Sequence, residues 1–340
     1  MSAIPYINEG KQYWLIRTNG GKYYRYYRSG GYIAINWDLI SFDEINELSV
    51  DDLSLRVKRD YPEAQRPGRA ANQLKIFTNQ IKAGDTVLIT GPSSHLISIG
   101  EVEDTIPYTA QPTLNEDGEI VGCPYIKRKR VRWLHEVEKL DLGKKLIKFV
   151  QRAEHTISEA NDYADEIEGL YHSFFINGDR AQLILEVEKE EAIPAAAFFE
   201  LGHEIFQLAR EFNEYSNGFK IDIAELATQI NINSRGKFKL AGIATSVIAI
   251  ALLFEGLTGG KSHIKFPIVG GGIDLEVGSI IRDISDFLDR REERKEKSLI
   301  MQKYIEQLEV KSPEELKALL QATETENKDN ENEGTTSAER

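Results

Sequence analysis

The run of uncharged residues from Leu240 to Phe254 (LAGIATSVIAIALLF) limits what this chain can fold into more than any other feature. As one helix, these fifteen residues would rise about 22 Å, which is shorter than the ~30 Å hydrocarbon core of a membrane. The side chains of Lys237 and Lys239 can snorkel and would extend the run toward a membrane span, whereas Glu255 favours burial inside a domain. The sequence therefore leaves two alternatives open: membrane contact through this helix, or a place in the interior of a domain or an oligomer.

Charge is divided unevenly along the chain of 340 residues, which is long enough for two domains and a tail. Residues 1–135 contain 17 Lys and Arg against 16 Asp and Glu, whereas the remaining residues contain 25 against 39. The net charge of −13 therefore resides in the second part. Because salt screens charges beyond about 8 Å, this acidity does not exclude nucleic acid from the first part, but it disfavours nucleic acid on the second.

The chain contains one cysteine, Cys123, so no intramolecular disulfide can form and a reducing compartment is expected. The first residues, MSAIPYINEGKQYW, lack the basic start and the apolar centre of a secretory signal. We therefore expect a cytoplasmic protein, associated with the inner membrane only if the run from Leu240 enters it.

The first part reads as short strands and two helices, punctuated by glycine pairs at 20–21 and 30–31. Ser49 stands three positions before Asp52, which is an N-cap pattern at the start of a helix. The predicted elements are strands at 13–17 and 32–37, helices at 49–60 and 68–83, and strands at 85–90, 96–102 and 130–134. Short strands with turn signals between them predict a small, strongly curved β-barrel.

The second part reads as mainly α-helical with one short β-hairpin, so the chain as a whole is predicted to be α+β. The hairpin lies in residues 172–188 around Asn177-Gly178, which is the strongest short hairpin signal. Helices are expected at 141–171, 193–215 and 279–309, and a polar, acidic and disordered tail at 322–340. The predicted domains are a reader at 1–137, an α+β helical domain at 138–235, an effector or oligomerisation region at 236–310, and a short helix with the tail at 311–340.

Several motifs of the first part follow one another in a fixed order. They are WLIR at 14–17, NGG at 19–21, GYIAINW at 31–37, RAANQL at 69–74, KAGDTVL at 82–88, IGEV at 99–102 and the stretch from Tyr125 to Leu134. Together these motifs resemble the EVE/PUA-like domains, and among them the N-terminal domain of Mrr-type restriction proteins. The resemblance implies a small barrel with a pocket for a flipped base, often a methylated or otherwise modified one.

The resemblance places three residues at that pocket. Trp14 and Trp37 would supply aromatic walls, and Asn36 stands where the family usually has Gly in IAIGW. A flipped base has two apolar faces and a polar edge, so aromatic walls with a few hydrogen-bonding groups suit it. Both tryptophans also fit the barrel core, Trp14 more readily because it lies in mid-strand and Trp37 less readily because it borders a loop.

Two groups of basic residues are candidates for contacts with phosphates. Arg66 and Arg69 precede and begin the second predicted helix. The other group lies in the last strand and consists of Lys127, Arg128, Lys129, Arg130 and Arg132. Since alternate residues of a strand face opposite sides, the two lysines should face away from the three arginines. A solvated strand face is the alternative for this group.

Matches to catalytic motifs lack essential residues. HEIFQ at 203–207 has no second His for a zinc-protease helix, so His203 is expected on a helix face. GGKS at 259–262 lacks the earlier Gly of a phosphate-binding loop, where the chain has Glu255. Cys123 precedes Pro124 and has no evident base partner. We therefore expect neither a metal nor a cofactor.

One further motif, GGGID at 270–274, resembles the element that supplies a metal-binding Asp in Mrr-type nucleases. Such a nuclease also needs, on its next strand, an acidic residue or Gln followed two positions later by Lys. Glu293 and Lys295 have this spacing but lie in a helical, highly charged stretch. Without these partners a divalent ion at Asp274 could not orient an attacking water, so a place in a turn or strand is the expected role of Asp274.

The sequence therefore favours a non-catalytic sensor joined to an effector or assembly region. The first domain would bind nucleic acid, including modified DNA, or a nucleotide, and the second would form a homo-oligomer, recruit a partner or disturb a membrane. Because EVE/PUA-like domains often occur in restriction and anti-phage systems, the resemblance implies defence against foreign DNA. The alternatives are a divergent nuclease that uses Asp274 and a membrane-anchored effector that responds to a nucleotide.

Overall fold

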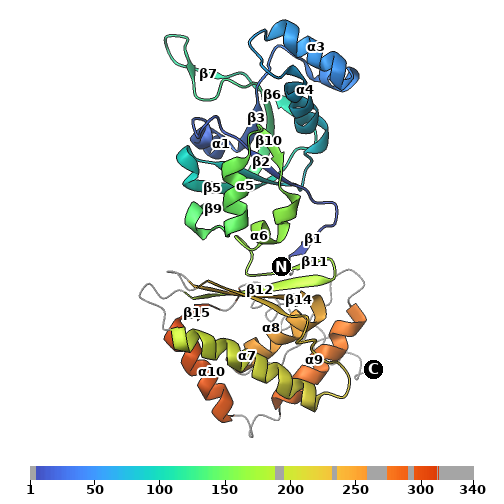
Figure 1. Ribbon diagram of the computed structural model, residues 1–340, viewed down its shortest axis with the longest axis vertical. Helices are drawn as coiled ribbons and strands as arrows, with labels where there is room; N and C mark the ends of the chain where they lie inside the picture. Colours follow the sequence, from blue (N-terminus) through green and yellow to red (C-terminus); the bar gives the residue numbers. More distant parts are fainter. Residues whose placement is uncertain are drawn as a thin grey trace, which may run out of the picture. The chain divides into compact units, whose positions relative to one another are not determined.

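A computed structural model describes residues 5–187, 195–231, 236–258, 274–289, 295–311 and 313. The chain divides into two compact units, which are described separately (Figure 1). The N-terminal unit is Gly10–Tyr171, and the C-terminal unit combines Met1–Glu9 with His172–Arg340.

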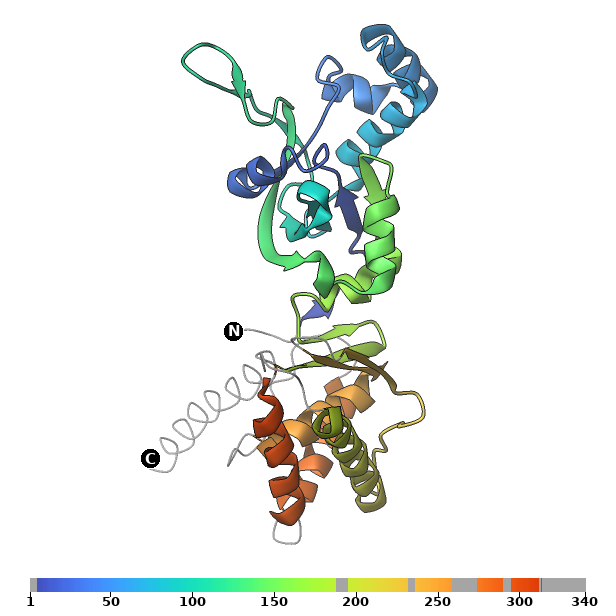
Figure 2. The same cartoon turned by 60° about the vertical axis from the view of Figure 1, so that its left-hand side comes forward.

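The N-terminal unit is built on a sheet of strand order β10-β2-β4-β5-β9-β3, with β6 paired to β9. β9 causes the curvature, because its first residues pair with β3 and its later residues pair with β5 (Figure 2). The predicted small barrel is therefore a curled half-barrel. The strands are β2 (Tyr13–Ile16), β3 (Tyr32–Ile35), β4 (Thr86–Thr90), β5 (Leu96–Val102), β6 (Tyr108–Thr109), β9 (Lys127–Glu138) and β10 (Ile157–Glu159), and β7 (Thr113–Leu114) with β8 (Ile120–Val121) forms a separate ribbon.

Helices of this unit cover the apolar side chains of the sheet. The predicted cap at Ser49 is confirmed, since its hydroxyl oxygen accepts a hydrogen bond of 3.1 Å from the backbone N–H of Asp52. The second predicted helix is also present, and its last turn is a π-helix. The helices are α1 (Tyr24–Gly30), α2 (Phe42–Glu47), α3 (Val50–Asp60), α4 (Pro67–Lys75), η1 (Ile76–Gln80), α5 (Lys144–Arg152) and α6 (Ala164–Glu168).

The C-terminal unit is a mixed α and β structure, which corrects the prediction of a mainly helical domain. Its sheet has the order β1-β11-β12-β14-β13, and β15 pairs with the end of β12. The predicted hairpin around Asn177 and Gly178 is confirmed as the β11–β12 pair. The neighbouring strand β14 was missed because its last four residues belong to the apolar run, which was read as one helix. The strands are β1 (Tyr6–Ile7), β11 (Phe174–Asn177), β12 (Arg180–Val187), β13 (Ala227–Asn231), β14 (Lys237–Ile243) and β15 (Val310–Lys311).

The apolar run that begins at Leu240 is split between two elements. Its first four residues end strand β14, and helix α8 (Ala244–Thr258) begins only at Ala244. α8 contacts α7 (Ala195–Tyr215), α9 (Asp274–Asp289), α10 (Lys295–Leu308) and two strands, and its residues from Val247 to Phe254 are buried. The alternative of a buried helix thus describes this segment, because protein surrounds it on all sides. No helix in the described ranges has the length and apolar character needed to cross a membrane.

The long charged helix predicted at 279–309 corresponds to the described helices α9 and α10. α9 ends at Asp289 and α10 begins at Lys295, while residues 290–294 lie outside the described residues. Ile280, Ile284 and Phe287 of α9 are fully buried, and their spacing of four and three residues places them on one face of the helix. The predicted tail at 322–340 also lies outside the described residues.

Candidate functional site

Trp14 lies in the core and does not form the wall of an open pocket. The residue is 4% exposed in β2, and its indole Nε1 donates a hydrogen bond of 3.0 Å to Oδ2 of Asp85. The same carboxylate accepts hydrogen bonds from the backbone N–H groups of Gln12 (3.1 Å) and Lys82 (2.9 Å). The core interpretation of Trp14 therefore describes its place in the fold.

Asn36 and Trp37 follow β3 and remain accessible. Asn36 is exposed, and Trp37 is half-buried against the core. Trp37 has a φ of 69°, a left-handed conformation that strains a residue with a bulky side chain by about 1–3 kcal/mol. Its carbonyl oxygen accepts a hydrogen bond of 3.1 Å from Nζ of Lys127. This lysine and the end of β3 thus hold Trp37 in place.

The two lysines of β9 face inward, opposite to the arginines, as the alternation along the strand predicts. Lys127 is 2% exposed and Lys129 is 0% exposed. Nζ of Lys129 donates hydrogen bonds to the carbonyl oxygens of Ile81 (2.7 Å) and Thr105. Burial lowers the pKa of Lys129 to about 8 and also lowers the pKa of Lys127. Within the folded unit neither ammonium group is placed to contact a phosphate.

The three arginines of β9 are more accessible, and each has a partner within the unit. The guanidinium carbon of Arg128 lies 4.2 Å from the ring centroid of Tyr32. Nη1 of Arg130 lies 3.5 Å from Oδ1 of Asp104. Nη2 of Arg132 lies 3.2 Å from Oε2 of Glu101. A phosphate at this edge would have to compete with these carboxylates.

Arg66 and Arg69 lie at the start of α4, where Arg66 is the N-cap residue. Arg66 is exposed and Arg69 is half-buried. Neither forms an ion pair with a residue that the structure describes. These two side chains are therefore freer to meet a phosphate than the basic residues of β9.

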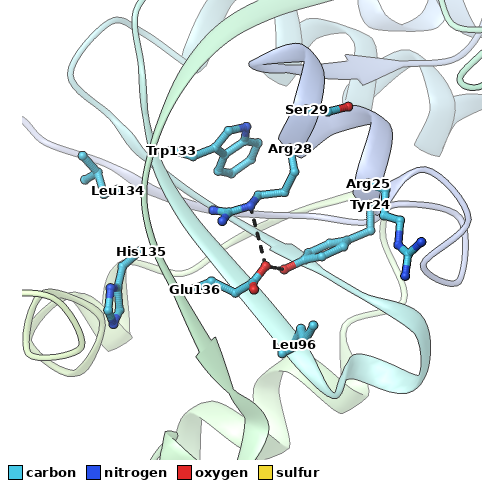
Figure 3. A pocket seen from close by; sticks show the side chains of 9 residues that line it. All are labelled: Tyr24, Arg25, Arg28, Ser29, Leu96, Trp133, Leu134, His135 and Glu136. Atoms are coloured by element: carbon cyan, nitrogen blue, oxygen red, sulfur yellow. Dashed lines mark hydrogen bonds and ion pairs between the residues drawn. The ribbon is translucent and has the colours of Figure 1, made fainter.

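The structure also contains a pocket that sequence reasoning missed, between α1 and the later residues of β9 (Figure 3). Its volume is about 820 Å³. Its lining combines aromatic, cationic, imidazole and carboxylate residues. The lining residues are Tyr24, Arg25, Arg28, Ser29, Leu96, Trp133, Leu134, His135 and Glu136.

A β-bulge explains how Trp133 and Glu136, three positions apart in β9, face the same pocket. In a regular strand, neighbouring side chains point to opposite faces. Here Gly100 of β5 pairs with Trp133 while Ile99 pairs with His135, so Leu134 is an extra residue in β9. The bulge shifts the alternation by one residue, so the side chains of Trp133 and Glu136 lie on the side of β9 that faces α1 (Figure 3). The side chains of Leu134 and His135 lie on the other side of the strand.

A network of hydrogen bonds orients the polar groups of the pocket. The hydroxyl of Tyr24 donates to Oε2 of Glu136 over 2.6 Å and lies 2.5 Å from Oγ of Ser98. Nε of Arg28 lies 3.6 Å from the same carboxylate oxygen (Figure 3). Burial, together with the bond to Glu136, raises the pKa of Tyr24 to about 12, so the phenol remains a donor at neutral pH. The pocket therefore holds one carboxylate in a fixed orientation beside a guanidinium group.

Trp133 is held at the pocket by its own hydrogen bond. Its Nε1 donates to the carbonyl oxygen of Tyr27 over 3.0 Å, and the residue is half-buried. Gly100 makes room for the indole, because a Cβ at this position would lie 2.6 Å from Cε3 of Trp133 and 2.5 Å from Cγ1 of Val131. The isolated Gly100 within a strand was the one sequence signal for the bulge.

We expect Gly100→Val to lower the free energy of unfolding of the N-terminal unit by about 1–3 kcal/mol, because the new side chain overpacks Trp133 and Val131. Chemical unfolding of the full chain, followed by tryptophan fluorescence, measures this change, since all three tryptophans lie in that unit. Gly68→Ala on α4 is the control, because its Cβ would meet only Oγ of Ser54 at 3.6 Å. Equal stability of the Gly100 variant and the wild type would contradict the tight packing at the bulge.

The remaining catalytic candidates stand as follows. Among the described residues no group of three or more His, Cys, Asp and Glu side chains could hold a metal ion. Asp274 is the first residue of helix α9 and does not lie in the predicted turn or strand, while the glycines before it lie outside the described residues. His203 lies exposed on α7, as predicted, and Cys123 is buried.

Comparison with known proteins matches only the first half of the chain. A family model described as a domain of unknown function (DUF8426) matches residues 13–157. No curated protein and no solved structure matches the chain. The matched segment begins with β2, reaches the first residue of β10 and contains every residue that lines the pocket of Figure 3.

Proposed function

We propose that the N-terminal unit is a non-catalytic reader that binds a nucleobase of nucleic acid in the pocket between α1 and the bulged end of β9. The observation that carries this proposal is the bulge, which brings Trp133 and Glu136 of β9 to the side of the strand that faces Tyr24 and Arg28 of α1. These side chains supply aromatic surface, hydrogen-bond donors and an acceptor within one pocket.

The chemistry of this pocket suits a planar polar ring. Its volume of about 820 Å³ falls within the ~300–1,000 Å³ typical of small-molecule sites. Stacking on an aromatic ring contributes about 1–3 kcal/mol per base and offsets part of the energy needed to unstack the base. Arginine donates to the acceptor edge of guanine, and a carboxylate accepts from the amino group of cytosine. Arg28 and Glu136 offer both kinds of contact.

The resemblance of residues 12–135 to the EVE/PUA-like domains supports the same assignment. The curled half-barrel is the kind of scaffold that the resemblance implies, and such domains accept flipped and modified bases. We therefore propose methylated or hydroxymethylated DNA as the first ligand to test, in the setting of defence against foreign DNA. The C-terminal unit, whose helix α8 is buried, would then supply assembly or effector action.

The test compares the binding of matched DNA duplexes that are unmodified or carry methylated or hydroxymethylated cytosine. We expect wild-type protein to prefer a modified duplex. Arg28→Gln should weaken binding to that duplex about tenfold, because one base-edge contact contributes about 1–3 kcal/mol. Arg132→Gln is the control, since this arginine of β9 is next to Trp133 in sequence but does not line the pocket and pairs with Glu101. It should change binding less than Arg28→Gln does.

A variant at the end of β3 separates the two candidate base sites. If Trp37→Ala removes the preference for modified DNA while Arg28→Gln leaves it intact, the base is read beside Asn36 and the pocket assignment is wrong. Equal weak binding of all duplexes that disappears with salt would indicate phosphate contacts alone and would contradict a base reader.

A further inference from the structure

A second pocket of the N-terminal unit lies against α5 and β10, which are both labelled in Figure 1. Its volume is about 650 Å³. Three of its lining residues are cations of α5, namely Lys145, Lys148 and Arg152. None of them belongs to the basic groups that the sequence singled out.

The three cations share one face of α5. They are spaced by three and four residues, which places them above one another along the helix. All three are exposed, and none forms an ion pair with a residue in the described part of the chain. They differ in this respect from Arg130 and Arg132 of β9, which pair with carboxylates. The pocket therefore gathers positive charge that the described residues do not neutralise.

The other walls of this pocket provide a ring surface and a polar group. The rings of Phe149 and Tyr163 are stacked, with centroids 4.7 Å apart and an interplanar angle of 27°. Oγ of Ser158 is buried and has no hydrogen-bond partner among the described residues. A buried hydroxyl without a partner is uncommon and remains able to donate to a ligand oxygen. Glu154 is the only carboxylate in the lining, against the three cationic side chains of α5.

We infer that this pocket binds phosphodiester groups of a nucleic-acid strand. Lysine ammonium groups contact phosphate as point charges, and the guanidinium of Arg152 can engage two phosphate oxygens at once. The Phe149–Tyr163 pair provides an apolar surface for the adjoining sugar or base. The inference rests on the proposed function to the extent that this strand is the one whose base is read in the pocket of Figure 3.

An abasic oligodeoxynucleotide tests the phosphate site without the base site, because it has phosphodiesters but no bases. We expect wild-type protein to bind it and the double variant Lys145→Gln/Lys148→Gln to bind it roughly 10–60-fold more weakly near 0.1 M salt. The slope of log K against log salt should become less steep by about 1–2. The control is Lys58→Gln/Lys82→Gln, which removes the same charge from exposed sites elsewhere in the unit and should leave the slope nearly unchanged.

Because the four lysines are exposed, we expect both double variants to stay folded, and thermal melting curves measure this. An abasic strand that fails to bind the wild type, or equal slopes for the two double variants, would overturn this inference. Neither result bears on base recognition, which is measured by the preference between duplexes. If the preference between duplexes is absent while the two double variants still differ in their salt slopes, the phosphate site is supported and base recognition is contradicted.

Discussion

Asp85→Ala is expected to lower the free energy of unfolding of the N-terminal unit by about 3–5 kcal/mol. The carboxylate is 4% exposed and accepts three hydrogen bonds, from the indole of Trp14 and from the backbone N–H groups of Gln12 and Lys82. Hydrogen bonds to a charged group contribute about 1.5–3 kcal/mol each, and a buried donor left without a partner costs about 1–3 kcal/mol. The methyl group of alanine can replace none of these contacts.

Tryptophan fluorescence reports this loss selectively, since the chain has three tryptophans and all lie in the N-terminal unit. Denaturant unfolding of the full chain should therefore show a lower midpoint for Asp85→Ala. Asp85→Asn retains one acceptor oxygen and should fall between the wild type and the alanine variant. Asp117→Ala, at an exposed turn, should have no measurable effect. A loss below about 1 kcal/mol for Asp85→Ala would show that water replaces the carboxylate and that the three contacts do not stabilise the fold.

Trp14 illustrates which part of the site the sequence could predict. Its mid-strand position favoured the core, and the structure places it there. The partner of its indole, Asp85, could not be recognised, because the two residues meet only when β2 and β4 pair in parallel. The burial of an aromatic residue thus follows from local pattern, whereas the identity of its polar partner depends on sheet topology.

The strand β9 shows a second limit. The alternation along the strand correctly separates Lys127 and Lys129 from the arginines. The same pattern gives no reason to bury the lysines, because charged side chains rarely face a core. Lys129 is buried because its ammonium reaches carbonyl oxygens at the end of η1 and in the loop near Thr105. Those acceptors lie more than twenty residues away in sequence.

The pocket of Figure 3 and the strand at the start of the apolar run were missed for related reasons. A bulge at Leu134 depends on the register between β5 and β9, which no residue of β9 encodes alone. An uncharged run is compatible with a buried strand as well as with a buried helix. Leu240 pairs with Leu183 of β12 and with Thr228 of β13, and these partners decide that the run starts as a strand.

The burial of Lys129 leads to the other large effect, a pH dependence of stability above pH 8. Its pKa is lowered to about 8 in the folded unit, against about 10.4 for an unfolded lysine. Between these values the unfolded chain binds more protons than the folded one, so this group makes the fold more stable as pH rises. The full gain is about 3 kcal/mol, because one unit of pKa corresponds to about 1.4 kcal/mol.

Tyrosines act in the opposite direction at higher pH. Burial raises the pKa of Tyr24 and of Tyr32 to about 12, whereas an unfolded tyrosine ionises near pH 10. Their stabilisation is therefore complete below about pH 10 and is lost as the pH rises from 10 to 12. Burial raises the pKa of the Cys123 thiol as well, so its contribution falls above about pH 8.5. These groups oppose Lys129 and must be separated from it.

Comparison with Lys129→Met makes that separation, because the tyrosines and Cys123 are present in both proteins. Without the buried ammonium, the variant should lack the stabilisation gained between pH 8 and pH 10.4. The free energy of unfolding of the wild type should thus rise by about 3 kcal/mol relative to the variant across this window, as measured by tryptophan fluorescence at closely spaced pH values. Parallel pH profiles would mean that Lys129 keeps an ordinary pKa and that its ammonium is hydrated in the folded unit. A growing difference would confirm that three backbone carbonyls, of Ile81, Asp104 and Thr105, hold a lysine that is neutral in mildly alkaline solution.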